Sequence, residues 1–205
     1  MDSHQAILRA VRRGLPAKTE YPTIDTMAWT HYPDRVHQFA EVLESVGGQC
    51  MVVSGLVDLN AALDQLPAYA AATKICSAVA GVGKANVQLD EIQDPHALED
   101  VDYAILPGEF GVAENGAVWL TDTQLKHRII CFIPQHIALV VRAENSLADA
   151  IVDHMHEAYR RVAIDGSNFG LFMSGPSKTA DIEQSLVIGA HGPRSLTVFL
   201  LHGSG

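Results

Sequence analysis

Residues 174–181 bring together hydroxyl, glycine and charged residues that could bind an anion. The segment reads SGPSKTAD and is predicted to join the end of a strand to the start of a helix. Free backbone N–H groups and the helix dipole at such a junction favour a negative ligand, and Lys178 adds positive charge. Alternatively, Ser177 or Thr179 only caps the helix; the spacing is not that of a Walker phosphate loop. The candidate ligand-binding residues are Ser174, Gly175, Ser177, Lys178, Thr179 and Asp181.

Glu114 and His191 are the candidate catalytic residues. Glu114 stands between apolar residues and an Asn-Gly turn in GVAENG. Partial burial there would raise its pKa, as a general acid or base requires. His191 lies in a His-Gly-Pro loop, where an imidazole could titrate or bind an anion. The alternatives are a surface charge at a hairpin corner and a plain turn. We predict that both side chains meet residues 174–181 in one cleft at the carboxyl ends of the strands.

A third polar group consists of Asp153, His154, His156 and Glu157. The apolar spacing predicts one long helix over residues 146–162, capped at its start by Ser146. On a helix, side chains two residues apart point about 200° apart, so the two histidines could not bind one metal ion. We interpret this group as a solvent-exposed helix face. We predict no metal site and no cofactor.

The three cysteines, Cys50, Cys76 and Cys131, lie far apart in the sequence. Each stands inside an apolar run, and no C-x-x-C spacing occurs. We therefore expect buried thiols. An iron–sulfur cluster, a zinc knuckle or a disulfide framework held by this chain alone is not expected.

Alternating helix and strand patterns must position these residues. Helices are predicted over residues 3–13, 34–46, 58–66, 146–162 and 179–188, and strands over residues 49–54, 74–79, 103–107, 111–120, 128–134, 137–142, 169–174 and 195–201. Such alternation predicts the α/β class, as a three-layer α/β/α sandwich with a mainly parallel sheet. The β-rich stretch 110–142 is expected to extend that sheet.

The first 33 residues are predicted to form a separate helix and arm. Residues 15–33 contain three prolines and show no sustained hydrophobic periodicity of a helix or a strand. We therefore expect an N-terminal helix and arm over residues 1–33 and one domain over residues 34–205.

Composition excludes several partners. The 14 Lys and Arg residues against 24 Asp and Glu give a net charge of −10, too acidic to neutralise nucleic acid or an anionic membrane. No apolar stretch approaches the ~20 residues that span a bilayer, and the N-terminus lacks the apolar core of a signal peptide. We expect no nucleic-acid partner, no membrane insertion and a cytoplasmic location.

Four segments resemble a known family. GVAENG, RIICFIPQHI, SGPSKTADIE and GAHGP, in this order and spacing, are similar to the lactate utilization (LUD) domain family, and within it to the lactate utilization protein C group. The family commonly has A-E-T-G where this chain has Ala113-Glu114-Asn115-Gly116, which keeps the carboxylate and the glycine. The resemblance covers roughly residues 35–201. It implies a fold similar to the NagB/RpiA/CoA-transferase group.

The resemblance also implies a function. The chain would be a cluster-free accessory or ligand-binding subunit of a cytoplasmic system that oxidises L-lactate to pyruvate beside iron–sulfur subunits, with a small anion as ligand. A second reading is a free-standing enzyme like the CoA-transferases or 5-formyltetrahydrofolate cyclo-ligase, with Glu114 as base or nucleophile on a phosphorylated or acyl substrate. Glu114-Asn115-Gly116 resembles the S-E-N-G motif of CoA-transferases. A third reading is an assembly protein with a vestigial pocket.

Overall fold

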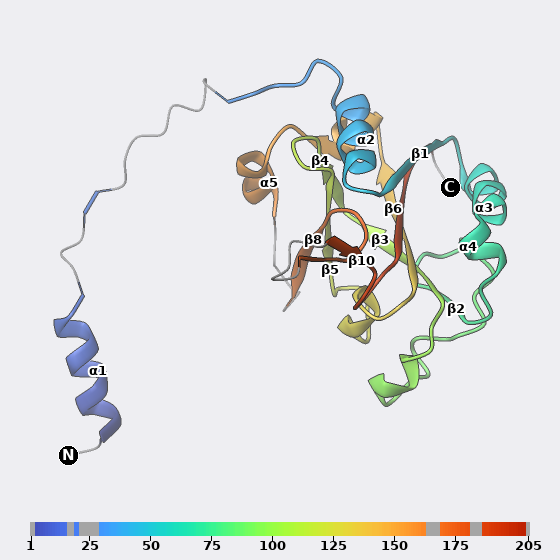
Figure 1. Cartoon of the computed structure of the whole chain (residues 1–205). Helices are drawn as coiled ribbons and strands as arrows, with labels where there is room; N and C mark the ends of the chain where they lie inside the picture. Colours follow the sequence, from blue (N-terminus) through green and yellow to red (C-terminus); the bar gives the residue numbers. More distant parts are fainter. Residues whose placement is uncertain (1–2, 16–18, 21–28, 163–168, 181–185, 204–205) are drawn as a thin grey trace.

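The computed structural model describes residues 3–15, 19–20, 29–162, 169–180 and 186–203 (Figure 1). Helix α1 (Ser3–Arg13) has no buried residue and lies apart from the domain in Figure 1. The division between an N-terminal arm and a domain at residue 34 stays a prediction. In the described part of the chain, no helix has the length and apolar character needed to cross a membrane.

The centre of the domain is a five-stranded, fully parallel sheet in the order β1-β11-β6-β3-β2. The strands are β1 (Gln49–Val53), β2 (Ile75–Ser77), β3 (Tyr103–Gly108), β6 (His136–Ala143) and β11 (Ser195–His202). The inner strands are apolar runs buried on both faces, as parallel sheets require.

Alternate side chains of β6 pack into two different cores. Ala138 and Val140 face helix α3 (Leu56–Gln65) and the short helix α4 (Pro67–Ala70). Ile137, Leu139 and Val141 face helix α2 (Arg35–Ser45) and a second sheet. Figure 1 shows α3 and α4 on one side of the central sheet and the second sheet on the other. The predicted α/β class with a mainly parallel sheet is confirmed.

Of the β-rich stretch 110–142, only β6 belongs to the central sheet, so the prediction that the whole stretch extends that sheet was wrong. The earlier strands of the stretch belong to a separate sheet in the order β7-β4-β5-β8. These strands are β4 (Phe110–Val112), β5 (Ala117–Thr121), β7 (Ile151–Val152) and β8 (Gly170–Met173). The chain passes from one sheet to the other at Gly108, where a Cβ would lie 2.6 Å from Val118 and 2.9 Å from Val141. β3 is already paired on both sides, so its continuation must find new partners.

The predicted hairpin at Asn115-Gly116 is present. β4 and β5 pair antiparallel, with Phe110 opposite Trp119. Gly116 has φ +64°, and a Cβ there would lie 2.8 Å from the backbone of Leu43 in α2. Glycine is therefore required for the turn and for the close approach of α2. The predicted helix from residue 34 is present as α2, and Asp34 caps it by accepting the N–H of His37 at 2.9 Å.

Two local predictions were wrong. Residues 128–134 contain the 3₁₀ helix η3 (Arg128–Cys131) instead of a strand. The predicted long helix is divided into the 3₁₀ helix η4 (Leu147–Ala150), strand β7 and helix α5 (Met155–Arg161). A further 3₁₀ helix, η2 (Pro95–Leu98), precedes β3. Ile151 and Val152, two of the apolar residues on which the helix prediction rested, are instead buried in the two-residue strand β7 beside β4.

The helix predicted near residues 179–188 is replaced by strands in its described part. β9 (Lys178–Ala180) pairs antiparallel with β10 (Leu186–Ile188), with Val187 opposite Thr179. The β-branched pair Val187 and Ile188 favours a strand. Gly189 follows with φ +68° and donates its N–H to Ser177 O at 2.8 Å. The helix N-terminus proposed as an anion cradle is therefore not formed by Lys178 and Thr179.

Candidate functional site

Four of the predicted site residues line one cavity, here called the serine cavity. It has a volume of about 280 Å³. Ser174, Gly175, Ser177 and His191 are among its lining residues. The cavity is lined by residues 131–132, 171–177 and 191–193.

The loops around the serine cavity are fixed by internal hydrogen bonds. Ser177 Oγ donates to His191 O at 2.5 Å, and Ser177 N donates to Pro193 O at 2.8 Å. Ser174 Oγ donates to Asn115 O at 2.7 Å. Both hydroxyl hydrogens are thus used within the protein, so these serines offer oxygen lone pairs to a ligand rather than donors.

Two glycines allow these loops to close. Gly175 has φ +72°, and a Cβ there would lie 2.7 Å from Val46 O. Gly192 has φ +106°, and a Cβ there would lie 3.2 Å from Phe132 O. Residues other than glycine rarely adopt a positive φ, so both positions depend on glycine. The backbone of the loops consequently comes close to the cavity.

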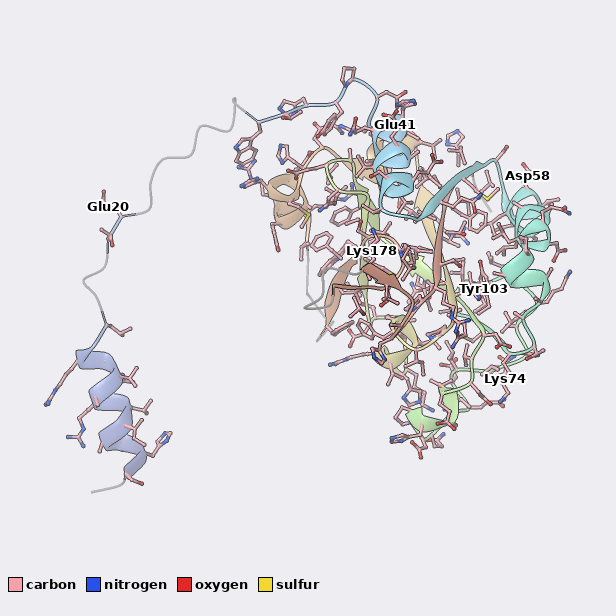
Figure 2. All side chains as sticks on the ribbon, in the orientation of Figure 1. Glu20, Glu41, Asp58, Lys74, Tyr103 and Lys178 are labelled. Carbon is pink, nitrogen blue, oxygen red and sulfur yellow. The ribbon has the colours of Figure 1, made fainter. Side chains whose placement is uncertain are left out.

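The other predicted ligand-binding residues do not line the serine cavity. Lys178 and Thr179 lie on β9 with exposed side chains. Figure 2 shows Lys178 on this hairpin, well away from Asp58 on α3. Asp181 lies outside the described residues.

Glu114 belongs to a different cavity, so the predicted single cleft is divided in two. Its Oε2 accepts the N–H of Met155 at 2.9 Å. Its backbone N–H donates to Asp153 O at 3.0 Å, because β4 runs parallel to β7 and carries Glu114 to the start of α5. The Glu114 cavity, about 240 Å³, is lined by Trp29, Thr30, Tyr32, Glu114, His154 and His156.

Asp153 is a functional candidate that the sequence did not indicate. Its side chain is only 1% exposed. It accepts hydrogen bonds from His31 Nδ1 at 2.6 Å, from Tyr32 N at 3.2 Å, and from Arg35 Nε and Nη2 at 2.9 and 3.2 Å. Burial alone would raise the pKa of Asp153, but the hydrogen bonds from His31, Tyr32 and Arg35 and the charge of Arg35 outweigh it and lower the pKa. The carboxylate is therefore charged at neutral pH.

Aromatic and basic side chains surround Asp153. Trp29 stacks on His156 with ring centroids 4.3 Å apart, and Trp29 and His154 meet in a T-shaped contact with ring centroids 4.7 Å apart. The guanidinium of Arg160 lies 5.1 Å from the centre of the Trp29 ring. A cavity of about 280 Å³, the Trp29 cavity, is lined by Trp29, His31, Arg35, His154, Glu157 and Arg160. The group interpreted as an exposed helix face is thus partly buried and partly lines two cavities.

The sequence signal was hidden by the wrong helix prediction. His154 precedes α5 in an extended conformation, so His154 and His156 lie with ring centroids 5.8 Å apart instead of on opposite helix faces. The partners of Asp153 come from residues more than 115 positions earlier, a separation that no local pattern reports. Within the described ranges, no group of three or more His, Cys, Asp or Glu residues could hold a metal ion.

The cysteines are separated in space as well as in sequence. Cys50 lies in β1 and Cys76 in β2, the two opposite edge strands of the central sheet, and Cys131 lies in η3. Burial raises the thiol pKa to about 11 for Cys50 and to about 12 for Cys76 and Cys131. These thiols are protonated at neutral pH and do not offer a shared set of thiolate ligands.

Known proteins similar to this chain agree on a family. The LUD domain profile matches residues 82–201. Lactate utilization protein C of Geobacillus thermodenitrificans (strain NG80-2) is 35% identical over 104 residues, 49% of this chain and 42% of that protein. Lactate utilization protein C of Bacillus pumilus (strain SAFR-032) is 27% identical over 110 residues, 53% of this chain and 45% of that protein. The matches therefore span less than half the length of these relatives.

A solved structure shares the fold. The crystal structure of a DUF162 family protein from Deinococcus radiodurans superposes with a TM-score of 0.59 at 24% identity. The superposition covers 82% of this chain and 96% of that one. The LUD match includes β3 to β10, all of β11 except His202, and every residue of the serine cavity. The chain belongs to the LUD domain family.

Proposed function

We propose that this protein is a component of a lactate utilization system, in which it supplies a binding site for a small anion. The LUD match and the names of the relatives support this role. The activity of the whole system, the oxidation of L-lactate to pyruvate, is part of the same proposal. So is a cytoplasmic location.

The observation that carries the proposal is the serine cavity. It lies within the residues matched to the LUD domain and, among its described lining residues, has no acidic side chain, although the chain carries a net charge of −10. Its volume of about 280 Å³ is at the lower end of ligand sites, which favours a small ligand over a dinucleotide. His191 is the side chain best suited to pair with the anion, since the serine hydroxyls donate to backbone carbonyls.

The proposal assigns any iron–sulfur clusters to partner subunits. A cluster needs several thiolates converging on one point. In this chain Cys50, Cys76 and Cys131 lie on separate elements, and burial raises their pKa values. The chain would therefore work beside iron–sulfur subunits as the subunit without clusters.

One observation favours a second candidate function, an acyl- or phosphoryl-transferring enzyme. Glu114 is exposed, lines the Glu114 cavity and has one carboxylate oxygen fixed by the N–H of Met155. A carboxylate held in this way could act as a base or nucleophile. Under this alternative, Glu114→Gln abolishes activity; under the lactate proposal with the serine cavity as the site, it leaves lactate consumption near the wild-type rate.

Complementation tests the lactate proposal. A strain without this gene would receive the wild type, His191→Ala, or the control His96→Ala, which changes a histidine that is also exposed. We expect L-lactate consumption to be restored by the wild type and the control and to fall about tenfold with His191→Ala, the loss of one hydrogen bond to the anion. Normal consumption without the gene would refute the function, and full activity of His191→Ala would refute the role of the serine cavity.

A further inference from the structure

His136 and Ser195 form a hydrogen-bonded pair that the proposed function does not use. They are direct neighbours at the amino ends of the parallel strands β6 and β11, and His136 Nδ1 lies 2.7 Å from Ser195 Oγ. Within the part of the chain that the structure describes, the Ser195 hydroxyl has no other hydrogen-bond partner. A serine hydroxyl that donates to a neutral imidazole is the arrangement that makes the serine oxygen a nucleophile.

The surroundings of His136 keep its imidazole oriented and neutral. The ring of Tyr103 stacks on it, with centroids 6.2 Å apart and an angle of 27° between the planes. Burial and the charge of Arg194 lower the pKa of His136, and the opposing effect of Asp102 is smaller. With the ring proton on Nε2, the lone pair of Nδ1 can accept the proton of Ser195 at neutral pH.

Ser195 lines a cavity at the amino-terminal edge of the central sheet, here called the Ser195 cavity, with a volume of about 320 Å³. Side chains alternate along a strand, so Ser195 and Thr197 face the same side of the sheet as Phe199, and Tyr103 the same side as Ile105. Phe199 and Ile105 pack in the core beneath α3 and α4. The rest of the wall comes from the turn before β1 and from the junction of α3 and α4.

The Ser195 cavity offers hydroxyl groups and no charge. Its described lining residues include no charged side chain. Thr197 and Tyr103 line it although they are only 5% and 1% exposed. Burial raises the pKa of Tyr103 despite the hydrogen bond with Thr197, so the phenol stays protonated. Two hydroxyls that share one hydrogen bond leave one hydrogen for the oxygen of a reacting carbonyl. A charged molecule would lose its hydration here without gaining an ion pair, which favours an uncharged substrate.

We propose that the Ser195 cavity is an esterase site for a small uncharged carboxylic ester, with Ser195 as the nucleophile and His136 as its base. Ser195 Oγ bonds to the carbonyl carbon and gives its proton to His136 Nδ1. The bond between that carbon and the ester oxygen breaks, and the leaving alcohol takes the proton from His136. Water, with His136 again as the base, then hydrolyses the acyl-serine and regenerates both residues. The proposal does not rest on the lactate function, because the Ser195 cavity and the serine cavity share no lining residue.

An uncharged fluorophosphonate ester tests the nucleophile directly. Ser195 Oγ would displace fluoride and form a stable phosphonyl-serine, which mass spectrometry of peptides assigns to one residue. In the wild-type chain we expect the label on Ser195, together with hydrolysis of 4-nitrophenyl acetate above the rate in buffer. Because the label is mapped in the wild type, this result does not depend on whether any variant folds.

Variants separate catalysis from a structural hydrogen bond. Ser195→Ala should abolish the protein-dependent hydrolysis, and His136→Gln should slow both labelling and hydrolysis about a hundredfold, the contribution of a general base. The matched control is Ser45→Ala, which removes an exposed serine whose hydroxyl donates to Val42 O at 2.7 Å and should change neither rate.

Four results would each overturn the esterase proposal. They are the absence of label on Ser195, label confined to Ser174 or Ser177, unchanged hydrolysis in Ser195→Ala, and equal labelling of the wild type and His136→Gln. The lactate proposal would stand after any of them, because its test is L-lactate consumption.

Discussion

The serine cavity and the Trp29 cavity are built in opposite ways. The serine cavity takes most of its wall from two short loops, around residues 174–177 and 191–193. The hydroxyl and the backbone N–H of Ser177 join the loops by donating to the carbonyls of His191 and Pro193. The Trp29 cavity depends on one ion pair, between the buried Asp153 and the half-buried Arg35, which lie more than 115 positions apart. A cavity built from local loops leaves a motif in the sequence, whereas one built from a long-range pair does not.

Removal of the buried carboxylate should have the largest effect on the Trp29 cavity. Asp153→Ala leaves Arg35 and His31 without their acceptor, and the free energy of unfolding should fall by about 3 kcal/mol, less than for a fully buried pair because both partners reach solvent. Urea unfolding measures this. The control Asp64→Ala removes one half of an exposed pair with Lys84 and should change little. Equal effects of the two variants would contradict the assigned role of Asp153.

A β-carbon at Gly175 should have the largest effect on the serine cavity. Gly175→Ala combines a φ of +72° with a contact of 2.7 Å to Val46 O, and should cost about 2 kcal/mol of unfolding free energy. Thermal unfolding compares it with Gly55→Ala, where the backbone is extended and no atom lies within 4 Å of the new carbon. If the two variants melt together, the loop geometry described here is wrong.

Protonation of Asp153 at low pH should lower the free energy of unfolding. Because the folded-state pKa of Asp153 lies below its unfolded value near 3.9, its stabilisation is complete above about pH 4 and is lost as the pH falls through the folded pKa. Unfolding free energies measured from pH 6 down to pH 3 should therefore fall less steeply in Asp153→Asn than in the wild type. Asp102, held by Thr73 and Lys74, has a lowered pKa for similar reasons, so Asp102→Asn is the control for acid effects elsewhere. Parallel curves for the wild type and Asp153→Asn would contradict the charged state of Asp153.

Lys178→Ala should have the smallest effect. Lys178 is exposed on β9, next to Ser177, and does not line the serine cavity. As a solvent-screened charge it should change anion affinity by less than about 1 kcal/mol and leave the melting temperature unchanged. Calorimetric titration with pyruvate checks this. A tenfold or greater loss of anion affinity would show that Lys178 contacts the ligand, and would place the anion near β9.

The sequence predicted the fold class well because its signals were local. The inner strands are long apolar runs, and Asp34 marks the start of α2 as a standard cap. The second sheet was not predictable in this way, because the pairing of β4 with the two-residue β7 is decided by tertiary contacts. The same contacts replaced the predicted helix over residues 146–162.

The site residues divide along the same line. The order of Ser174, Gly175, Ser177 and His191 in two motifs was enough to predict that they lie together. Glu114 was assigned to the wrong cavity, because its direction depends on β7 and on the N–H of Met155. Asp153 was missed because no sequence pattern shows that its partners, which lie at the end of the proline-containing segment 15–33 and just after it, pack against it.

Reconstitution tests the central claim most directly. Partner subunits that purify with the tagged chain would be separated from it and assayed for L-lactate-dependent dye reduction with and without the chain. The account predicts that dye reduction falls to background without the chain, returns when the chain is added back, and that iron stays with the partners. Full activity of the partners alone, or lactate oxidation by this chain alone, would contradict it.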